Sequence, residues 1–191
     1  MSLLVLGLVL FLGIHSVSIV APAWRDRQIA RRGEKPWKGV YALISLAALV
    51  LLIHGYGLAR QAPLVLYAPP PALRHVAMLL MLPVFPLLFA AYLPGRLQRA
   101  ARHPMLLAVM FWAAAHLLAN GTLADLLLFG GFLVWAVADR ISVGRRAVPR
   151  KVPGAPPSAV NDIAALAGGL LVYAGLLFWG HAWLTGVPLL G

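Results

Sequence analysis

The sequence contains no cysteine. This absence excludes disulfide bonds, iron–sulfur clusters, zinc–thiolate sites, covalent haem attachment through Cys-x-x-Cys-His and cysteine nucleophiles. It leaves imidazole as the one strong ligand for haem iron or soft metals, and the chain has six histidines. Any haem or soft-metal site would therefore depend on histidine.

Acidic residues are also scarce. The chain has five Asp and Glu against sixteen Lys and Arg, a formal net charge of +11. A basic excess of this size indicates nucleic-acid binding when the cations form one patch. Here they occupy short connections between apolar runs, which is typical of orientation signals at a membrane surface. We therefore expect a lipid bilayer as the partner, and no nucleic acid.

Apolar sequence is abundant. Hydrophobic residues make up 62% of the 191 residues, and the mean hydropathy is +0.87. Apolar runs of about 17–25 residues, separated by basic clusters, are typical of membrane proteins with several crossings. The sequence predicts an all-α integral membrane protein, with residues 1–191 forming a single domain, a bundle of about six transmembrane helices. The expected helices span about 3–23, 39–58, 75–93, 104–119, 122–138 and 160–184.

The distribution of the cations predicts the orientation. Fourteen of the sixteen Lys and Arg fall in the first, third and fifth connections, within residues 25–38, 96–102 and 140–151. The other two, Arg60 and Arg74, lie in the second connection. Because Lys and Arg are retained on the cytoplasmic side, we expect those three clusters inside. Both termini are then on the outer, periplasmic side.

The stretch 102–121 has the clearest limits. His103-Pro104 predicts a helix start, because proline lacks the N–H that a first turn cannot use. Asn120-Gly121 predicts a tight turn that sends the chain straight back. Between them lies an almost wholly apolar helix that carries one ionisable side chain, His116. Such a residue inside a membrane-length helix is a candidate functional site.

His15 and His54 also fall within apolar runs. At about 1.5 Å per residue, these two histidines and His116 lie within about 10 Å of one another in depth, so a shared site is possible. Zinc is disfavoured, since the only acids near these runs, Asp125 and Asp162, stand at helix ends. A haem is favoured over interhelical packing of the histidines, and both are favoured over a proton relay.

Several motifs resemble the NnrU family over essentially the whole chain. They are Leu-Gly-Ile-His-Ser in the first run, the basic connection with Tyr41, Leu-Tyr-Ala-Pro-Pro, Arg-His-Pro-Met-Leu, and Ala-His-Leu-Leu-Ala-Asn-Gly-Thr. NnrU proteins are bacterial integral membrane proteins associated with denitrification and nitric oxide metabolism. The family is similar to the plant 15-cis-zeta-carotene isomerases, which hold haem b on histidines of the same motifs. The resemblance thus implies the bacterial inner membrane, with His15 and His116 as axial ligands of haem b iron.

One departure bears on activity. The isomerases have a cysteine directly after the Trp of the fourth-helix motif, whereas Trp112 is followed by Ala113. Thiolate chemistry is therefore excluded, which weakens the transfer of isomerase activity more than the transfer of haem.

Two classes of function follow. The first is a haem-dependent protein of nitrogen-oxide or redox metabolism, or an isomerase of an apolar polyene, with the polyene or nitric oxide as ligand. The second is a non-enzymatic assembly factor whose histidines only pack helices. Whether the protein is an enzyme stays open at this point. His54 is a weaker candidate ligand, and Arg60 and Arg74 are either propionate partners or plain loop charges.

The absence of cysteine makes the orientation testable. We expect Ser2→Cys and Leu190→Cys to react with a membrane-impermeant thiol reagent only from the periplasmic face. Arg31→Cys, in the first basic connection, should react only from the cytoplasmic face. Labelling of residues 2 and 190 from the cytoplasm alone would reverse the assignment.

Overall fold

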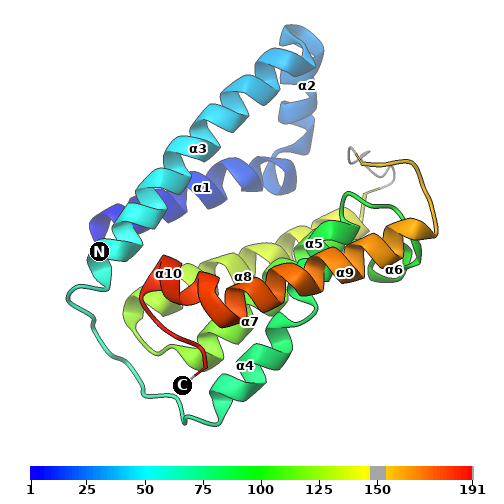
Figure 1. Ribbon diagram of the computed structural model, residues 1–191. Helices are drawn as coiled ribbons and strands as arrows, with labels where there is room; N and C mark the ends of the chain where they lie inside the picture. Colours follow the sequence, from blue (N-terminus) through cyan, green and yellow to red (C-terminus); the bar gives the residue numbers. More distant parts are fainter. Residues whose placement is uncertain (147–153, 191) are drawn as a thin grey trace. The chain divides into compact units, whose positions relative to one another are not determined.

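The computed structural model describes residues 1–146 and 154–190 (Figure 1). Regular structure in these ranges is helical, and an isolated bridge between Val65 and Thr122 is their one β-type pairing. The all-α expectation is confirmed. Of the expected basic clusters, the part over residues 147–151 lies outside the described residues.

The chain forms two compact units. The first unit comprises Met1–Pro70 and Ala119–Ala147, and the second unit comprises Pro71–Leu118 and Val148–Gly191. The single domain expected over the whole chain stays a prediction. The helices of the first unit are α1 (Ser2–Val20), α2 (Pro22–Arg32), α3 (Glu34–Ala59) and α8 (Leu123–Gly144). Those of the second are α4 (Leu73–Met81), α5 (Val84–Ala90), α6 (Arg96–Ala101), α7 (Pro104–Ala119), α9 (Val160–Gly175), a π-helical segment (Leu176–Gly180) and α10 (His181–Thr185).

Five helical stretches of the described chain are long and apolar enough to cross a membrane, as expected of a multi-pass membrane protein. They are Ser2–Val20, Glu34–Ala59, Leu73–Ala90, Leu123–Gly144 and Val160–Thr185. A sixth apolar helix, α7, has the limits that the sequence predicts and is shorter, at 16 residues. The number of crossings and the side on which the termini lie stay predictions.

Glycines set how α1 and α3 pack in the first unit. The helices run antiparallel, with Gly7 against the backbone of Leu52 and Gly55 against that of Leu4. A Cβ atom at Gly7 would lie 2.6 Å from the Leu52 nitrogen, closer than side chains pack. Such close backbone approach is how helices associate in apolar surroundings. These contacts fix the register of the two helices. At each contact, the residue number in α1 and the residue number in α3 add up to 59.

The third long helix of the first unit, α8, lies along α1 and runs in the same direction. Phe11 faces Phe132 with ring centroids 5.5 Å apart. Four residues further along α1 and three further along α8, His15 approaches Trp135 at 5.9 Å between ring centroids. Gly131, next to Phe132, lies against Leu12. In the expected bundle successive helices cross in opposite directions, so the first and fifth helices would also run in the same direction.

Several helices depart from the expected limits, and α3 begins at Glu34, five residues before the expected start at 39. The basic connection after α1 is itself a helix, α2, which begins at Pro22 in the first position, where its missing N–H is not needed. Helix α8 continues six residues beyond the expected end at 138, to Gly144. The apolar run of α8 ends at residue 138, and the helix continues through polar last turns. In these turns Asp139 pairs with Arg146, which lies beyond the helix end.

The turn between α7 and α8 is held by the segment 64–67. The Gly121 carbonyl accepts hydrogen bonds from the Leu66 and Tyr67 nitrogens at 2.8 and 3.2 Å, and the Tyr67 hydroxyl donates to the Asn120 carbonyl at 2.7 Å. A Cβ atom at Gly121 would collide with the Tyr67 carbonyl oxygen. The Asn-Gly turn predicted from the sequence is therefore confirmed, and its glycine is required by this contact.

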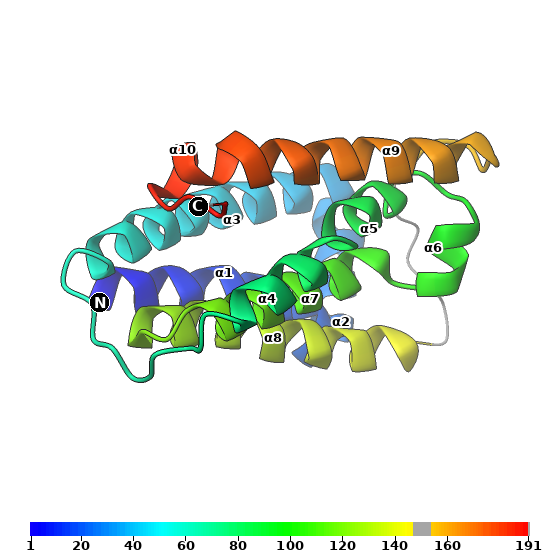
Figure 2. The same cartoon turned by 60° about the horizontal axis from the view of Figure 1, so that its bottom comes forward.

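In the second unit, a proline break separates two helices that pack on α9. Helix α4 ends at Met81 and α5 begins at Val84, with Pro83 between them, as two nearby prolines predict. Helix α5 runs antiparallel to α9 (Figure 2), where Pro86 lies against Gly169. Asp162, in the first turn of α9, accepts the Arg96 and Leu97 backbone N–H groups at 2.9 Å each and so caps α6.

The glycine register gives a stability prediction. Gly55→Ala places a methyl group in the Leu4 backbone, so we expect a loss of about 1–3 kcal/mol in the free energy of unfolding. The measurement is unfolding in detergent micelles. Gly57→Ala is the matched control, because it lies two residues away in the same helix with no atom within 4 Å of the added Cβ. Equal stability of the two variants would contradict this packing.

Candidate functional site

The His15 side chain lies among aromatic rings from three helices of the first unit. It is half-buried on α1 and stacks on Phe11, with ring centroids 4.2 Å apart. Tyr41 of α3 lies 5.2 Å away and Trp135 of α8 5.9 Å away, measured between ring centroids. The rings hold the imidazole in an apolar environment in which it has few alternative orientations.

A backbone hydrogen bond determines which nitrogen of His15 carries the proton. Its Nδ1 lies 2.6 Å from the carbonyl oxygen of Phe11, one turn earlier on α1. A carbonyl oxygen only accepts, so Nδ1 donates and the lone pair of the neutral ring is on Nε2. Histidines that bind metals are held in this way, with the other ring nitrogen donating to a carbonyl or carboxylate.

His116 has the same arrangement in the second unit. It lies in the last turn of α7, and its Nδ1 is 2.8 Å from the carbonyl oxygen of Trp112. The Trp112 ring is 5.3 Å away between centroids and packs against a hydrophobic cluster of the second unit. The buried residues of that cluster are Val84, Leu87, Ala101 and Ala108. In both histidines named by the motifs, Nδ1 donates and the lone pair of the neutral ring is on Nε2.

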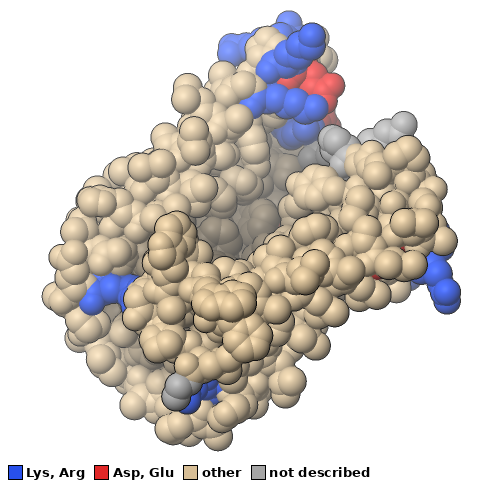
Figure 3. Space-filling model, viewed as in Figure 1, with Lys and Arg blue, Asp and Glu red and all other residues tan. Residues whose placement is uncertain are grey.

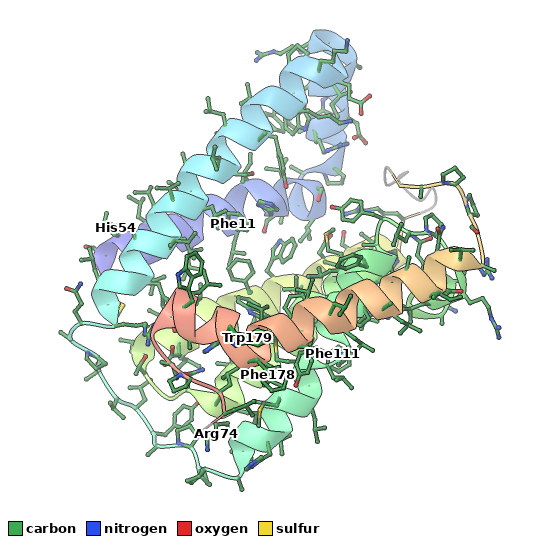
Figure 4. The ribbon with its side chains drawn as sticks, viewed as in Figure 1. Phe11, His54, Arg74, Phe111, Phe178 and Trp179 are labelled. Carbon is green, nitrogen blue, oxygen red and sulfur yellow. The ribbon has the colours of Figure 1, made fainter. Side chains whose placement is uncertain are left out.

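His54 is placed differently. It is exposed, near the end of α3 that lies beside the N-terminus of α1 (Figure 4). In the glycine register His15 is level with residue 44 of α3, ten residues before His54, or about 15 Å along the helix. This separation exceeds the depth spread of about 10 Å expected from the sequence. One metal ion cannot bind both rings, and the choice of partner for His116 stays a prediction.

The two candidate propionate partners are both exposed. Arg60 stands directly after the last residue of α3, and Arg74 lies in the first turn of α4 (Figure 4). They belong to different units, and each stands at a helix end. Their role toward a haem stays a prediction.

Trp135 is a site residue that the sequence reading missed. Its Nε1 atom is buried, and the described chain provides no hydrogen-bond acceptor for it. Buried donors without a partner are uncommon in native proteins and need an explanation. This one lies on the residue whose ring approaches His15. A bound group that carries a hydrogen-bond acceptor would satisfy this donor.

A buried ion pair closes this end of the first unit. Arg146 Nη2 donates to Asp139 Oδ1 at 3.2 Å, with the two side chains only 20% and 15% exposed. The same nitrogen donates to the Ser18 carbonyl at 3.1 Å, in the last turn of α1. The pair therefore ties the end of α8 to the end of α1, one turn beyond His15 and Trp135.

A second polar cluster lies at the opposite end of the first unit. Asp125 is 5% exposed and accepts the Tyr56 hydroxyl at 2.6 Å. Its other oxygen accepts the Thr122 hydroxyl at 2.6 Å and the Thr122 backbone N–H at 3.0 Å. Thr-Leu-Ala-Asp is a capping box, which the sequence could have shown. With all these donors in place, the carboxylate holds α3 to the start of α8.

The structure bears on the choice of metal. In the described ranges, no group of three or more His, Cys, Asp or Glu side chains could hold a metal ion. Zinc in proteins takes three or four protein ligands. A haem asks for only one or two axial ligands. The arrangement of single, oriented imidazoles fits that lower requirement.

Comparison with known families decides the relationship. The family model for the NnrU protein matches residues 3–189. The chain belongs to the NnrU family. The resemblance read from its motifs is thereby confirmed across nearly all of the sequence. No curated protein and no solved structure matches this NnrU chain, so its site is assigned from its own residues.

The protonation of these histidines can be measured. In haem-free protein with ¹⁵N-labelled histidine, we expect His15 and His116 to give the nitrogen shifts of the Nδ1-protonated tautomer. The Phe11 and Trp112 carbonyls accept only from that form. Signals are assigned by their loss in His15→Gln and His116→Gln, with His54→Gln as the comparison. Protonation at Nε2 would show that neither ring is oriented as described.

Proposed function

We propose that this NnrU-family protein binds haem b in the bacterial inner membrane, with His15 and His116 as axial ligands. The observation that supports it is shared by the two residues. Each imidazole donates from Nδ1 to the carbonyl oxygen four residues earlier, at 2.6 and 2.8 Å. Each therefore offers Nε2 from a rigid helix, which is how axial histidines are held.

The residues around His15 have definite roles in this proposal. Phe11, Tyr41 and Trp135 exclude water from the imidazole and offer flat apolar surface to a porphyrin. The buried Trp135 Nε1–H donates to an acceptor at the edge of the bound group. When bound, haem supplies an iron centre that exchanges electrons or takes a small ligand such as nitric oxide.

Arg60 and Arg74 are proposed as partners of the haem propionates. Arginine offers two parallel N–H donors to a carboxylate, and both residues lie in the one connection that carries cations on the outer side. Their exposure agrees with this role and equally with that of plain loop charges.

The reaction we favour is haem-dependent nitrogen-oxide or redox chemistry linked to denitrification. Isomerisation of an apolar polyene is the other haem-dependent form, and it would proceed without a thiolate because the chain has no cysteine. Both forms need a haem held in an apolar site.

A non-enzymatic role is the second candidate. The stacking of His15 on Phe11 at 4.2 Å, with its Nδ1 satisfied within its own helix, also suits a histidine that only packs helices. Such a protein would assist the assembly of a membrane complex. It would carry no pigment, which distinguishes it from the first candidate.

The ligand pair is tested by absorption spectroscopy. Protein purified in detergent should show a Soret band that responds to reduction. His15→Ala and His116→Ala should each shift or abolish it, because each removes one axial nitrogen. His54→Ala should preserve it. Haem lost in His54→Ala but retained in His15→Ala would make α3 the source of the second ligand.

A colourless wild-type protein after growth with added haem precursor would reject the haem assignment and leave the assembly role. A native spectrum in all three variants would also reject these histidines as ligands. Circular dichroism of each variant shows whether a lost band reflects lost ligation or lost folding.

The arginines are tested separately. We expect the Arg60→Gln, Arg74→Gln double variant to lose haem faster to apomyoglobin than the wild type, because the propionates lose their charge-assisted bonds. The Arg99→Gln, Arg102→Gln variant removes the same charge elsewhere and serves as the control. Unchanged transfer in the first variant would assign Arg60 and Arg74 as loop charges.

A further inference from the structure

The level of the bilayer surface can be read from the packing of α1 and α3. The apolar run of α1 ends at Val20, and that of α3 begins after Gly39. The register set by the two glycine contacts, extended along both helices, brings these residues to about the same level. Both helices therefore cross the surface at the same level. Helix α2, which connects them, begins two residues after Val20 and lies at that surface.

One face of α2 combines a tryptophan with arginines. Trp24, Arg27 and Arg31 are spaced three and four residues apart, which places them in a row along the helix. All three are exposed, Trp24 by 45%. No residue of α2 is fully buried. The three side chains of this row are therefore accessible to groups at the membrane surface.

The acidic residues of this region are already paired. Asp26 forms an ion pair with Arg25 at 2.8 Å, and Glu34 with Lys38 at 2.8 Å. Four further cations have no acidic partner within the described chain, namely Arg27, Arg31, Arg32 and Lys35. They gather on the surface over α2 and the start of α3, the blue cluster at the top of Figure 3. Their charge is available to an anionic partner.

An aromatic pair holds this surface in place. Trp24 meets Trp37, in the first turn of α3, edge to face with ring centroids 5.7 Å apart. Tryptophan is enriched at membrane interfaces, where its ring sits at the level of the headgroups. The pair therefore keeps α2 beside α3 and places its row of arginines at headgroup depth.

We propose that α2 and the first turn of α3 form a binding surface for anionic phospholipid headgroups. Arginine binds the phosphate with two parallel donors, and Trp24 packs beside the glycerol and upper acyl chain. A phosphatidylglycerol headgroup keeps its full negative charge, whereas the choline of phosphatidylcholine offsets it. The surface therefore selects lipids by net charge. This proposal does not depend on haem or on which side is cytoplasmic.

The test uses the full-length protein in phosphatidylcholine vesicles that contain a trace of spin-labelled lipid. Electron paramagnetic resonance separates lipid held at the protein from free lipid and gives a relative association constant. For the wild type we expect spin-labelled phosphatidylglycerol to be held roughly threefold or more over spin-labelled phosphatidylcholine at low salt. High salt should reduce this preference, since surface charges are screened.

The variant Arg27→Gln, Arg31→Gln, Arg32→Gln should lose most of the preference. Arg27→Lys, Arg31→Lys, Arg32→Lys keeps the charge and should retain more of it, which separates lipid binding from a folding defect. The matched control, Arg96→Gln, Arg99→Gln, Arg102→Gln, removes the same charge from the connection after α5 and should keep the preference. Equal association of the two lipids with the wild type would overturn the proposal. So would an equal loss of preference in the control.

Discussion

The close approach of α1 and α3 at two glycines is the contact on which the first unit depends. Gly7 and Gly55 let the helix backbones meet, and that contact alone determines which residues stand at the same depth. It places His15 beside Tyr41 and leaves His54 about 15 Å away along the helix. Extended along both helices, the same register brings Val20 to about the level of Gly39, where the two apolar runs end. One packing contact thus positions the candidate site and the basic helix α2.

Polar groups in the apolar part of the chain are satisfied locally, and this explains much of the remaining structure. No water is available inside a bilayer, so each buried donor or acceptor needs a protein partner. His15 and His116 use a carbonyl of their own helix, while Asp125 takes the Tyr56 hydroxyl from another helix. In the described residues, Trp135 Nε1 and Ser45 Oγ are buried without a hydrogen-bond partner. The unsatisfied Trp135 donor thus lies beside the oriented imidazole of His15.

The sequence predicts those features that depend on neighbouring residues. His103-Pro104 and Asn120-Gly121 gave the limits of α7 correctly, because helix starts and tight turns are decided locally. The all-α class and NnrU membership follow from apolar runs and motifs. The separation of His15 and His54 could not be predicted from the sequence. Their depths were counted from the ends of the apolar runs, and such a count does not include where the two helices contact each other. The Trp135 contact escaped for the same reason.

Helix α2 shows another limit of sequence reading. A run of cations was taken for a connection because charge interrupts an apolar pattern, yet charge does not prevent helix formation. The same holds for the end of α8, where Asp139 and Arg146 pair beyond the apolar run. Whether His15 and His116 share one haem depends on how the two units are arranged, which no local pattern encodes.

The first unit is discontinuous along the chain, and this has a consequence for biosynthesis. Residues 1–70 leave the ribosome before α8 exists, and the 48 residues of 71–118 are made in between. Until α8 arrives, the Tyr56 hydroxyl lacks Asp125, and the segment 64–67 lacks the turn that it binds. The nascent α1–α3 hairpin must therefore wait in the membrane, incomplete, for a helix translated much later. The first unit therefore reaches its final packing late in synthesis, once α8 has been made.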